Sequence, residues 1–171
     1  MTDSTPFDNA KLTIRKAYPQ DAPALAAMLV ALCEFEGTQT PFDALKYAKT
    51  IQRLIESDNS NYFFLIAESD DVPLGFISYY FGYDLSSLSQ GAHVGDLFIR
   101  DEWRNAKIGS KLMAAVAKQV MHQSGQWISL TALKTNSHAK DFYEKRGGIA
   151  VPVQFYAWGQ KGLEKLIKAA S

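Results

Sequence analysis

The chain contains a single cysteine, Cys33, so it cannot form a disulfide within itself. This is typical of proteins that fold in a reducing compartment. The chain also lacks the continuous apolar stretch of about 20 residues that a transmembrane helix requires. Residues 1–10, MTDSTPFDNA, lack the basic end and apolar run of a signal peptide and are predicted to form a flexible N-terminus. We therefore expect a cytoplasmic protein with no membrane partner.

An excess of charge of one sign is also missing. Lys and Arg total 18 and Asp and Glu total 18 among 171 residues, so no long-range field favours binding to nucleic acid. The three histidines, His93, His122 and His138, lack the spacing of metal ligands, and no metal site is predicted. What the chain does have is 47% hydrophobic residues, which indicates a globular protein with a core.

Hydrophobic periodicity predicts the order β-α-α-β-β-β-α-β-α-β. Strands are expected in residues 11–18, 61–70, 74–84, 93–103, 127–133 and 151–159. Helices are expected in residues 20–37, from Thr40 to about 55, and in 109–121, 137–148 and 163–170. The early strands join as hairpins and the later ones through helices, so the fold class is α/β with a mixed sheet. No linker or repeat interrupts the pattern, and residues 11–171 are predicted to form one domain.

The segment RNAKIGSKLM, residues 104–113, lies where a predicted strand meets a predicted helix. The first N–H groups of a helix lack internal partners and lie at the positive end of its dipole, so such a terminus binds phosphate well. Arg104 and Lys107 add positive charge, and Gly109 allows close approach. The segment is neither a Walker loop nor a dinucleotide fingerprint. Its chemistry alone leaves two interpretations, an anion site or a solvated basic turn.

The ordered elements around this turn resemble those of the GNAT acetyltransferases. That family's motif is Arg/Gln-x-x-Gly-x-Gly/Ala, in which Arg104 and Gly109 match and Lys107 stands where the first Gly is usual. The segments EFEG, GFISYYFGYD, GDLFIRDEWRNAKIGSKLM and NSHAKDFYEKRG look most like the diamine and thialysine (spermidine/spermine-type) N-acetyltransferases. The resemblance runs from about Thr13 to Trp158. It implies the GNAT acyl-CoA N-acyltransferase fold, with six to seven strands flanked by about four helices.

The resemblance also implies acetyl-CoA as the co-substrate. The turn would hold its pyrophosphate, and the backbone of the preceding strand would bind pantetheine and supply an oxyanion donor. Asn136 would contact the pantetheine arm, unless it serves only as a cap. The implied cofactor-binding residues are Leu97, Phe98, Ile99, Arg104, Asn105, Ala106, Lys107, Ile108, Gly109, Ser110, Asn136, Ala139 and Tyr143.

Acetyl transfer to an amine needs a base, because an alkyl ammonium has a pKa of about 10.4, and the leaving thiolate benefits from an acid. The Tyr that matches Tyr143 points at the CoA sulfur in the family, which implies a general acid; otherwise Tyr143 packs on its helix. Polyamine-type relatives carry a Glu for proton removal where this chain has Gly95. Asp96 can act instead through a water only if a bulge at Gly95 re-aims it, because neighbouring strand residues face opposite ways. Otherwise Asp96 makes a turn or strand-edge hydrogen bond.

Acidic and aromatic residues suggest where the acceptor would bind. Glu36 matches an acidic residue that lines the amine site in relatives, Phe35 stands where an aromatic is usual, and Asp84 is a further carboxylate. The implied substrate-binding residues are Phe35, Glu36, Asp84, Ser129, Leu130 and Thr131. Two or three acids suit a cationic amine; the alternative is that they are solvated residues at the ends of elements.

The leading hypothesis is an acetyl-CoA-dependent N-acetyltransferase. It would act by direct attack in a ternary complex on a primary amine of a small molecule, such as a diamine, a polyamine or a thialysine-like compound. Relatives of this type are usually dimers, so the resemblance implies a homodimer to which residues 151–159 contribute. The alternatives are a GNAT module that binds acyl-CoA as a sensor or interaction protein, and an unrelated phosphate-binding α/β domain.

Overall fold

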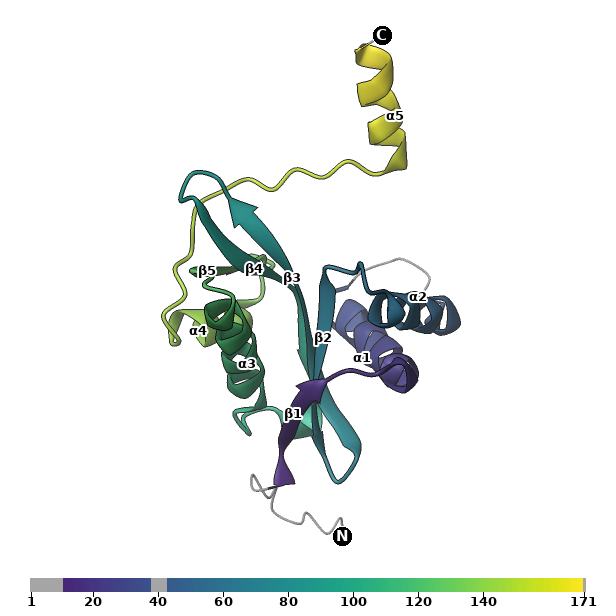
Figure 1. Ribbon diagram of the computed structural model, residues 1–171, viewed down its shortest axis with the longest axis vertical. Coiled ribbons are helices and arrows are strands. Elements are labelled where there is room, and N and C mark those ends of the chain that lie inside the picture. Colours follow the sequence, from purple (N-terminus) through teal and green to yellow (C-terminus); the bar gives the residue numbers. More distant parts are fainter. Residues whose placement is uncertain (1–10, 38–42, 171) are drawn as a thin grey trace. The chain divides into compact units, whose positions relative to one another are not determined.

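The computed structural model describes residues 11–37 and 43–170, in two compact units, Met1–Thr131 and Ala132–Ser171 (Figure 1). The predicted flexible N-terminus, residues 1–10, and the predicted helix start at Thr40 lie outside the described residues. The single domain expected for residues 11–171 stays a prediction, and each unit is described by itself.

The first unit is built on a five-stranded mixed sheet, which confirms the α/β class. The strands lie in sequence order: β1 (Thr13–Lys16), β2 (Tyr62–Ser69), β3 (Val72–Asp84), β4 (Ser89–Ile99) and β5 (Trp127–Leu130). The pairs β1–β2, β2–β3 and β3–β4 are antiparallel, and β5 runs parallel to β4. Short turns join β2 to β3 and β3 to β4, the first connection from β1 to β2 runs through α1 (Ala22–Phe35) and α2 (Ala44–Glu56), and the parallel crossover from β4 to β5 needs a helix.

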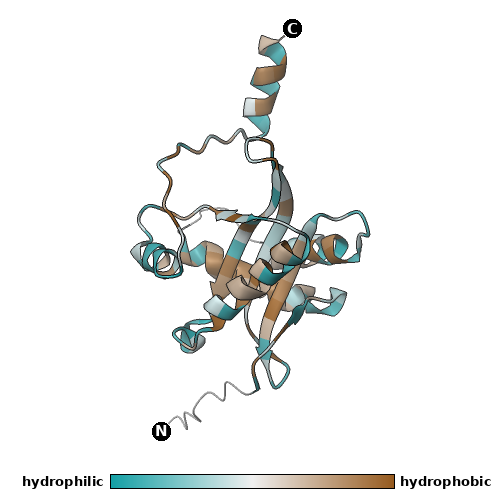
Figure 2. Ribbon diagram, turned by 60° about the vertical axis from the view of Figure 1, so that its left-hand side comes forward, coloured by the Kyte–Doolittle hydropathy of each residue, from teal (hydrophilic) through white to brown (hydrophobic). Residues whose placement is uncertain are grey.

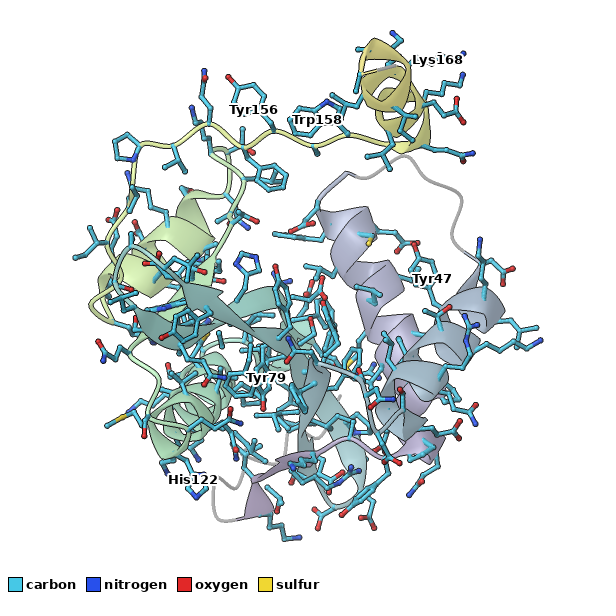
Figure 3. All side chains as sticks on the ribbon, turned by 45° about the horizontal axis from the view of Figure 1, so that its top comes forward. Tyr47, Tyr79, His122, Tyr156, Trp158 and Lys168 are labelled. Carbon is cyan, nitrogen blue, oxygen red and sulfur yellow. The ribbon has the colours of Figure 1, made fainter. Side chains whose placement is uncertain are left out.

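Helices cover both faces of this sheet. Helices α1 (Ala22–Phe35) and α2 (Ala44–Glu56) lie on one face, and α3 (Ile108–His122) lies on the other (Figure 1). The middle of β3 is therefore buried on both sides: Phe76 packs in the α1–α2 core, whereas Ile77 packs in the α3 core. Figure 2 shows the hydrophobic residues gathered along the sheet. Tyr79 belongs to this interior, whereas His122 at the end of α3 is exposed (Figure 3).

Several boundaries differ from the predictions, and two of them have a direct local reason. Strand β4 begins at Ser89 rather than at residue 93, because residues 85–88 alone make the turn of the β3–β4 hairpin. Helix α2 is capped by Asp43, whose side chain accepts the backbone N–H of Lys46 at 3.0 Å. Asp43 was expected to lie inside this helix.

The second unit contains α4 (Ser137–Glu144) and α5 (Gln160–Ala169), joined by a segment without regular secondary structure. The strand predicted for residues 151–159 is wrong in this structure. Its alternating pattern is real, but no strand pairs with it among the described residues, and Val153 and Phe155 are 71% and 80% exposed. Tyr156 and Trp158 lie on the same segment (Figure 3). A strand needs a neighbour to receive its backbone hydrogen bonds, and a period-two pattern alone does not supply one.

The described part of the chain thus has five strands instead of six or seven, and five α-helices instead of about four. None of its helices is long and apolar enough to cross a membrane.

Candidate active site

A β-bulge divides β4 at Gly95. Tyr79 of β3 pairs with Val94, and the next residue back, Ser78, pairs with Asp96, which leaves Gly95 without a partner. This is the bulge on which a role for Asp96 depends. Without the extra residue, Asp96 would face the same side as Val94, which packs in the α3 core. With it, Asp96 faces the α1–α2 side of the sheet, as Phe98 does.

The Asp96 side chain is held by a short hydrogen-bond network. Ser78 Oγ donates to Asp96 Oδ2 at 2.6 Å and accepts the Asp96 backbone N–H at 3.0 Å. Tyr62 on β2 lies 3.0 Å from Ser78 Oγ through its hydroxyl, and 3.5 Å from Asp96 Oδ2. Ser78 is fully buried, whereas Asp96 and Tyr62 are half-buried. The network fixes one carboxylate oxygen and leaves the side chain at the edge of the core.

Two more ionisable groups at the end of α1 share this region. Burial raises the pKa of Glu36, and the Asp96 carboxylate raises it further. Burial likewise raises the pKa of the Cys33 thiol, with additional contributions from Asp96 and Glu36. Glu36 and Asp96 are therefore close enough to repel each other. A cation bound beside them would relieve that repulsion.

The turn before α3 has the backbone geometry of an anion site. Asn105 and Lys107 both adopt left-handed conformations, with φ of 70° and 62°, and Lys107 is the N-cap of α3. The Lys107 side chain makes no capping hydrogen bond to this end of the helix. A 15-residue helix that begins directly after left-handed residues fits a phosphate group. Glycine adopts a left-handed backbone more readily than any other residue, so Lys107 stands at a position that suits glycine.

The other residues of the turn divide between the core and the surface. Ile108 and Gly109 are buried, Ala106 packs against the α3 core, and Ser110 is half-buried. Arg104 pairs with Asp101 at 2.7 Å, and its guanidinium lies 5.0 Å from the ring centre of Phe35. The structure thus places Arg104, which was expected at the pyrophosphate, against Phe35, which was expected at the acceptor amine.

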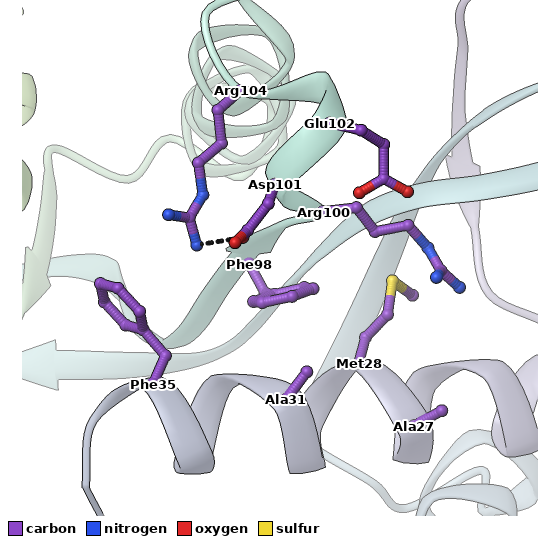
Figure 4. A pocket seen from close by; sticks show the side chains of 9 residues that line it. All are labelled: Ala27, Met28, Ala31, Phe35, Phe98, Arg100, Asp101, Glu102 and Arg104. Carbon is purple, nitrogen blue, oxygen red and sulfur yellow. Dashed lines mark ion pairs between the residues drawn. The ribbon is translucent and has the colours of Figure 1, made fainter. Parts of the chain in front are cut away.

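A pocket of about 380 Å³ surrounds this contact. One wall comes from α1 and the other from the end of β4 and the short 3-10 helix η3 (Asp101–Trp103). The lining residues are Ala27, Met28, Ala31, Phe35, Phe98, Arg100, Asp101, Glu102 and Arg104. Figure 4 shows the Arg104–Asp101 ion pair and the ring of Phe35 in this pocket. Its walls combine apolar surface with charges of both signs.

The backbone of β4 beyond the bulge is open on one side. Within the described residues, β5 pairs only with Gly91–Val94. Leu97, Phe98 and Ile99 pair with β3 on their other side. The unpaired edge offers N–H and C=O groups to a ligand, which is what the predicted pantetheine contacts require.

Two groups of predicted substrate-binding residues lie elsewhere in the first unit. Asp84 is at the far end of β3, six residues or about 20 Å from Ser78. Hydrogen bonds from Ser86 and Ser87 lower its pKa, so it behaves as a turn residue. On β5, Ser129 Oγ lies 3.1 Å from Nδ1 of His93, and Leu130 packs in the α3 core. Thr131 follows the strand directly and is exposed.

Three predicted residues lie in the second unit. Asn136 is the N-cap of α4, and its side chain accepts the backbone N–H of Ala139 at 3.0 Å. Tyr143 is half-buried, and its ring packs edge-on against Phe142 with centres 5.2 Å apart. The capping role expected as the alternative for Asn136 is therefore present.

Sequence reasoning missed Tyr62 and Ser78. Both sit in apolar strand runs where a single polar atom carries no periodic signal. Only the register places them beside Asp96, because Ser78 pairs with Phe64 on one side and with Asp96 on the other. In the described ranges, no group of three or more His, Cys, Asp or Glu side chains could hold a metal ion.

Comparison with known proteins agrees with this geometry. The sequence model described as the acetyltransferase (GNAT) family matches residues 27–148. L-ornithine N5-acetyltransferase of Arabidopsis thaliana is 30% identical over 79 residues, 46% of this chain but only 35% of that enzyme's length. Thialysine N-epsilon-acetyltransferase of Sus scrofa is 27% identical over 148 residues, 81% of this chain and 84% of the enzyme. Among solved structures, an integron cassette protein from the V. cholerae mobile metagenome shares the fold, with a TM-score of 0.79 at 24% identity over 92% of this chain and 98% of that one.

Proposed function

The chain belongs to the GNAT acetyltransferase family, and from this premise we propose that it transfers an acetyl group from acetyl-CoA to a primary amine of a small molecule. The names of two relatives specify amines at the end of a short chain, in ornithine and in thialysine. A diamine, a polyamine or a thialysine-like amino acid shares that chemistry. The attack is direct, in a ternary complex of protein, acetyl-CoA and amine.

The observation that carries the proposal is the bulge at Gly95. It turns Asp96 to the α1–α2 side of the sheet beside the open edge of β4, where its charge raises the pKa of Glu36. The paired carboxylates attract an ammonium group, and Asp96 takes its proton through a water molecule so that the neutral amine attacks. A backbone N–H of Leu97, Phe98 or Ile99 stabilises the negative charge that develops on the thioester oxygen.

Residues of the turn and of the second unit complete the proposal. Arg104, Lys107 and the N–H groups at the start of α3 hold the pyrophosphate of acetyl-CoA, which supplies the activated acetyl group. Asn136 can contact the pantetheine arm through the part of its amide that is not used in capping. Tyr143 protonates the leaving thiolate sulfur. Phe35 and Glu36 line the acceptor side.

The test follows release of free CoA thiol from acetyl-CoA with a panel of diamines, polyamines, thialysine, aminoglycosides and peptides. We expect release that depends on a small amine and falls about 10²-fold or more in Tyr143→Phe. Tyr83→Phe is the matched control, because the Tyr83 hydroxyl only donates to the Leu88 carbonyl in the β3–β4 turn. No release with any amine, while calorimetry shows intact acetyl-CoA binding, would instead favour an acyl-CoA-binding module.

We also propose that the protein is a homodimer joined through residues 151–159. Val151, Val153 and Phe155 alternate along this segment and are all strongly exposed, so in an extended conformation they present one apolar face. Such a face is typical of a surface covered by a partner. Light scattering is expected to give the mass of a dimer for the wild type and of a monomer for Phe155→Asp. A monomeric wild type would contradict the proposal.

A further inference from the structure

Ser78 connects three groups through one hydroxyl. Its oxygen can donate one hydrogen bond and accept two. The single proton goes to Asp96 Oδ2 at 2.6 Å, because a carboxylate only accepts. The Asp96 N–H occupies one acceptor site at 3.0 Å, and the Tyr62 hydroxyl, also at 3.0 Å, must donate to the other. The full capacity of Ser78 is therefore used, and the order of donation is Tyr62 to Ser78 to Asp96.

This order leaves one atom of Asp96 available for chemistry. Oδ2 accepts from Ser78 and lies 3.5 Å from the Tyr62 hydroxyl, whereas Oδ1 has no hydrogen-bond partner among the described residues. The Tyr62 phenol stays protonated, because burial and the charge of Asp96 raise its pKa. It therefore remains a donor to Ser78.

The same hydroxyl occupies the space above the bulge. A Cβ added at Gly95 would lie 2.4 Å from Tyr62 Oη and 3.0 Å from Ser78 Oγ. Any side chain at this position, including the Glu expected from polyamine-type relatives, would require Tyr62 to move. The position of Tyr62 therefore depends on Gly95, because the absence of a side chain at residue 95 leaves space for the phenol that supports Asp96.

We propose that Ser78 and Tyr62 are positioning residues that hold Asp96 with Oδ1 free to accept the proton of the acceptor amine. This inference rests on the proposed acetyl transfer. The proton passes from the ammonium nitrogen to a water molecule while the water passes one of its own to Asp96 Oδ1, so charge and protons balance. Ser78 and Tyr62 keep their own protons and do not contact the amine.

The experiment compares the wild type, Ser78→Ala and Tyr62→Phe in the CoA-release assay with two kinds of primary amine at one pH. A strongly basic amine is an ammonium ion and must lose a proton before it attacks, whereas a weakly basic amine is already neutral and skips that step. For the basic amine we expect kcat to fall about tenfold or more in Ser78→Ala and about fivefold in Tyr62→Phe, as for loss of a hydrogen bond to a charged and to a neutral group. For the weakly basic amine we expect less than about a twofold change.

Tyr80→Phe is the matched control, because Tyr80 pairs with Tyr62 across the strands and stacks on its ring but makes no hydrogen bond to the network. It is expected to behave as the wild type with both amines. A purely structural role for Ser78 and Tyr62 would lower the rates with both amines alike, and that result would overturn the inference. Unchanged rates in both variants would also overturn it.

A second measurement does not depend on turnover. Hydrogen exchange of the Asp96 amide is expected to quicken in Ser78→Ala, which loses the acceptor, and to stay unchanged in Tyr62→Phe. Unchanged exchange in Ser78→Ala would refute the network itself. If the wild type releases no CoA with any amine, the proposed function fails, and the positioning role fails with it. That outcome is distinct, because the variants then have no wild-type rate to lose.

Discussion

The two halves of β4 differ although they belong to one strand. Before Gly95, Gly91–Val94 pair with β3 on one side and with β5 on the other, and Ala92 and Val94 pack in the α3 core. After it, Leu97–Ile99 pair with β3 alone, and Phe98 packs on the α1–α2 side. The first half holds the sheet together, whereas the second half presents an open edge.

One extra residue causes this difference. A bulge shifts the alternation of side chains by one, so every residue beyond it faces the opposite side from the one that regular alternation would give. Asp96 is thereby removed from the apolar α3 core, where an unpaired charge would be costly. It is placed instead beside Ser78 and Tyr62. The strand therefore changes from pairing on both edges to an open edge at a single backbone position.

The largest effect is expected from Asp96→Asn in the second half of β4, compared with Val94→Ala in the first half. Asp96→Asn keeps a side-chain acceptor for Ser78 but removes the proposed base, so kcat/KM is expected to fall about 10²- to 10⁴-fold with little change in the free energy of unfolding. Val94→Ala leaves a cavity in the α3 core, so it is expected to lower the free energy of unfolding by about 1–3 kcal/mol. Turnover per folded molecule should stay near that of the wild type.

Urea denaturation and the CoA-release assay on both variants separate the two effects. A loss of stability without loss of activity in Asp96→Asn would reverse the assignment. It would mean that Asp96 only satisfies a strand-edge hydrogen bond, which was the alternative interpretation of this residue.

The next largest effect is expected at Gly95, which separates the two halves of β4. Gly95→Ala places a Cβ 2.4 Å from the Tyr62 hydroxyl, so Tyr62 must move and Asp96 loses part of its support. We expect turnover to fall about tenfold, comparable to the loss of a hydrogen bond in a charged network. Gly82→Ala in β3 is the matched control, since its Cβ would make only an ordinary 3.4 Å contact with Trp127.

Crystal structures or nuclear magnetic resonance spectra of both glycine variants would locate the Tyr62 ring. Equal rates in the two variants, with Tyr62 undisturbed, would contradict the close approach. By the same reasoning, Gly95→Glu is not expected to restore the arrangement of polyamine-type relatives while Tyr62 remains in place.

How much of this was accessible from the sequence depends on distance along the chain. The mixed sheet followed from local patterns, whereas the condition of a bulge at Gly95 followed from the Glu that polyamine-type relatives carry there, combined with the alternation of strand side chains. Tyr62 and Ser78 could not be found in this way, since their contact with Asp96 depends on the register of three strands.

In the second unit, the sequence predicted a strand that the structure does not have. The segment 151–159 has the alternation of a strand, yet the described chain provides no strand to pair with it. A local pattern states which faces are apolar but not what covers them. The same limit applies to Asp84, whose place in the sequence suggested the cleft but whose hydrogen bonds belong to the β3–β4 turn.

The smallest expected effect lies in the turn that follows the open half of β4. Lys107 has a left-handed backbone, which costs a non-glycine residue about 1 kcal/mol. Lys107→Gly removes that strain and the positive charge together, whereas Lys107→Gln removes only the charge. We expect the free energy of unfolding to rise by up to about 1 kcal/mol in Lys107→Gly, reduced by the greater unfolded-state entropy of glycine, and to stay unchanged in Lys107→Gln.

Both variants should bind acetyl-CoA several-fold more weakly at low salt, and the difference should shrink as salt is added, because an exposed charge is screened. Lys118→Gln, an exposed charge further along α3, is the control for a general loss of positive charge. Calorimetric titration with acetyl-CoA measures the effect of the Lys107 charge on binding, and urea denaturation measures the effect of its backbone conformation on stability. Unchanged affinity in both variants would show that the turn holds its anion through backbone N–H groups alone. Lys107 would then be a substitution that the fold tolerates at a glycine position rather than a second phosphate contact.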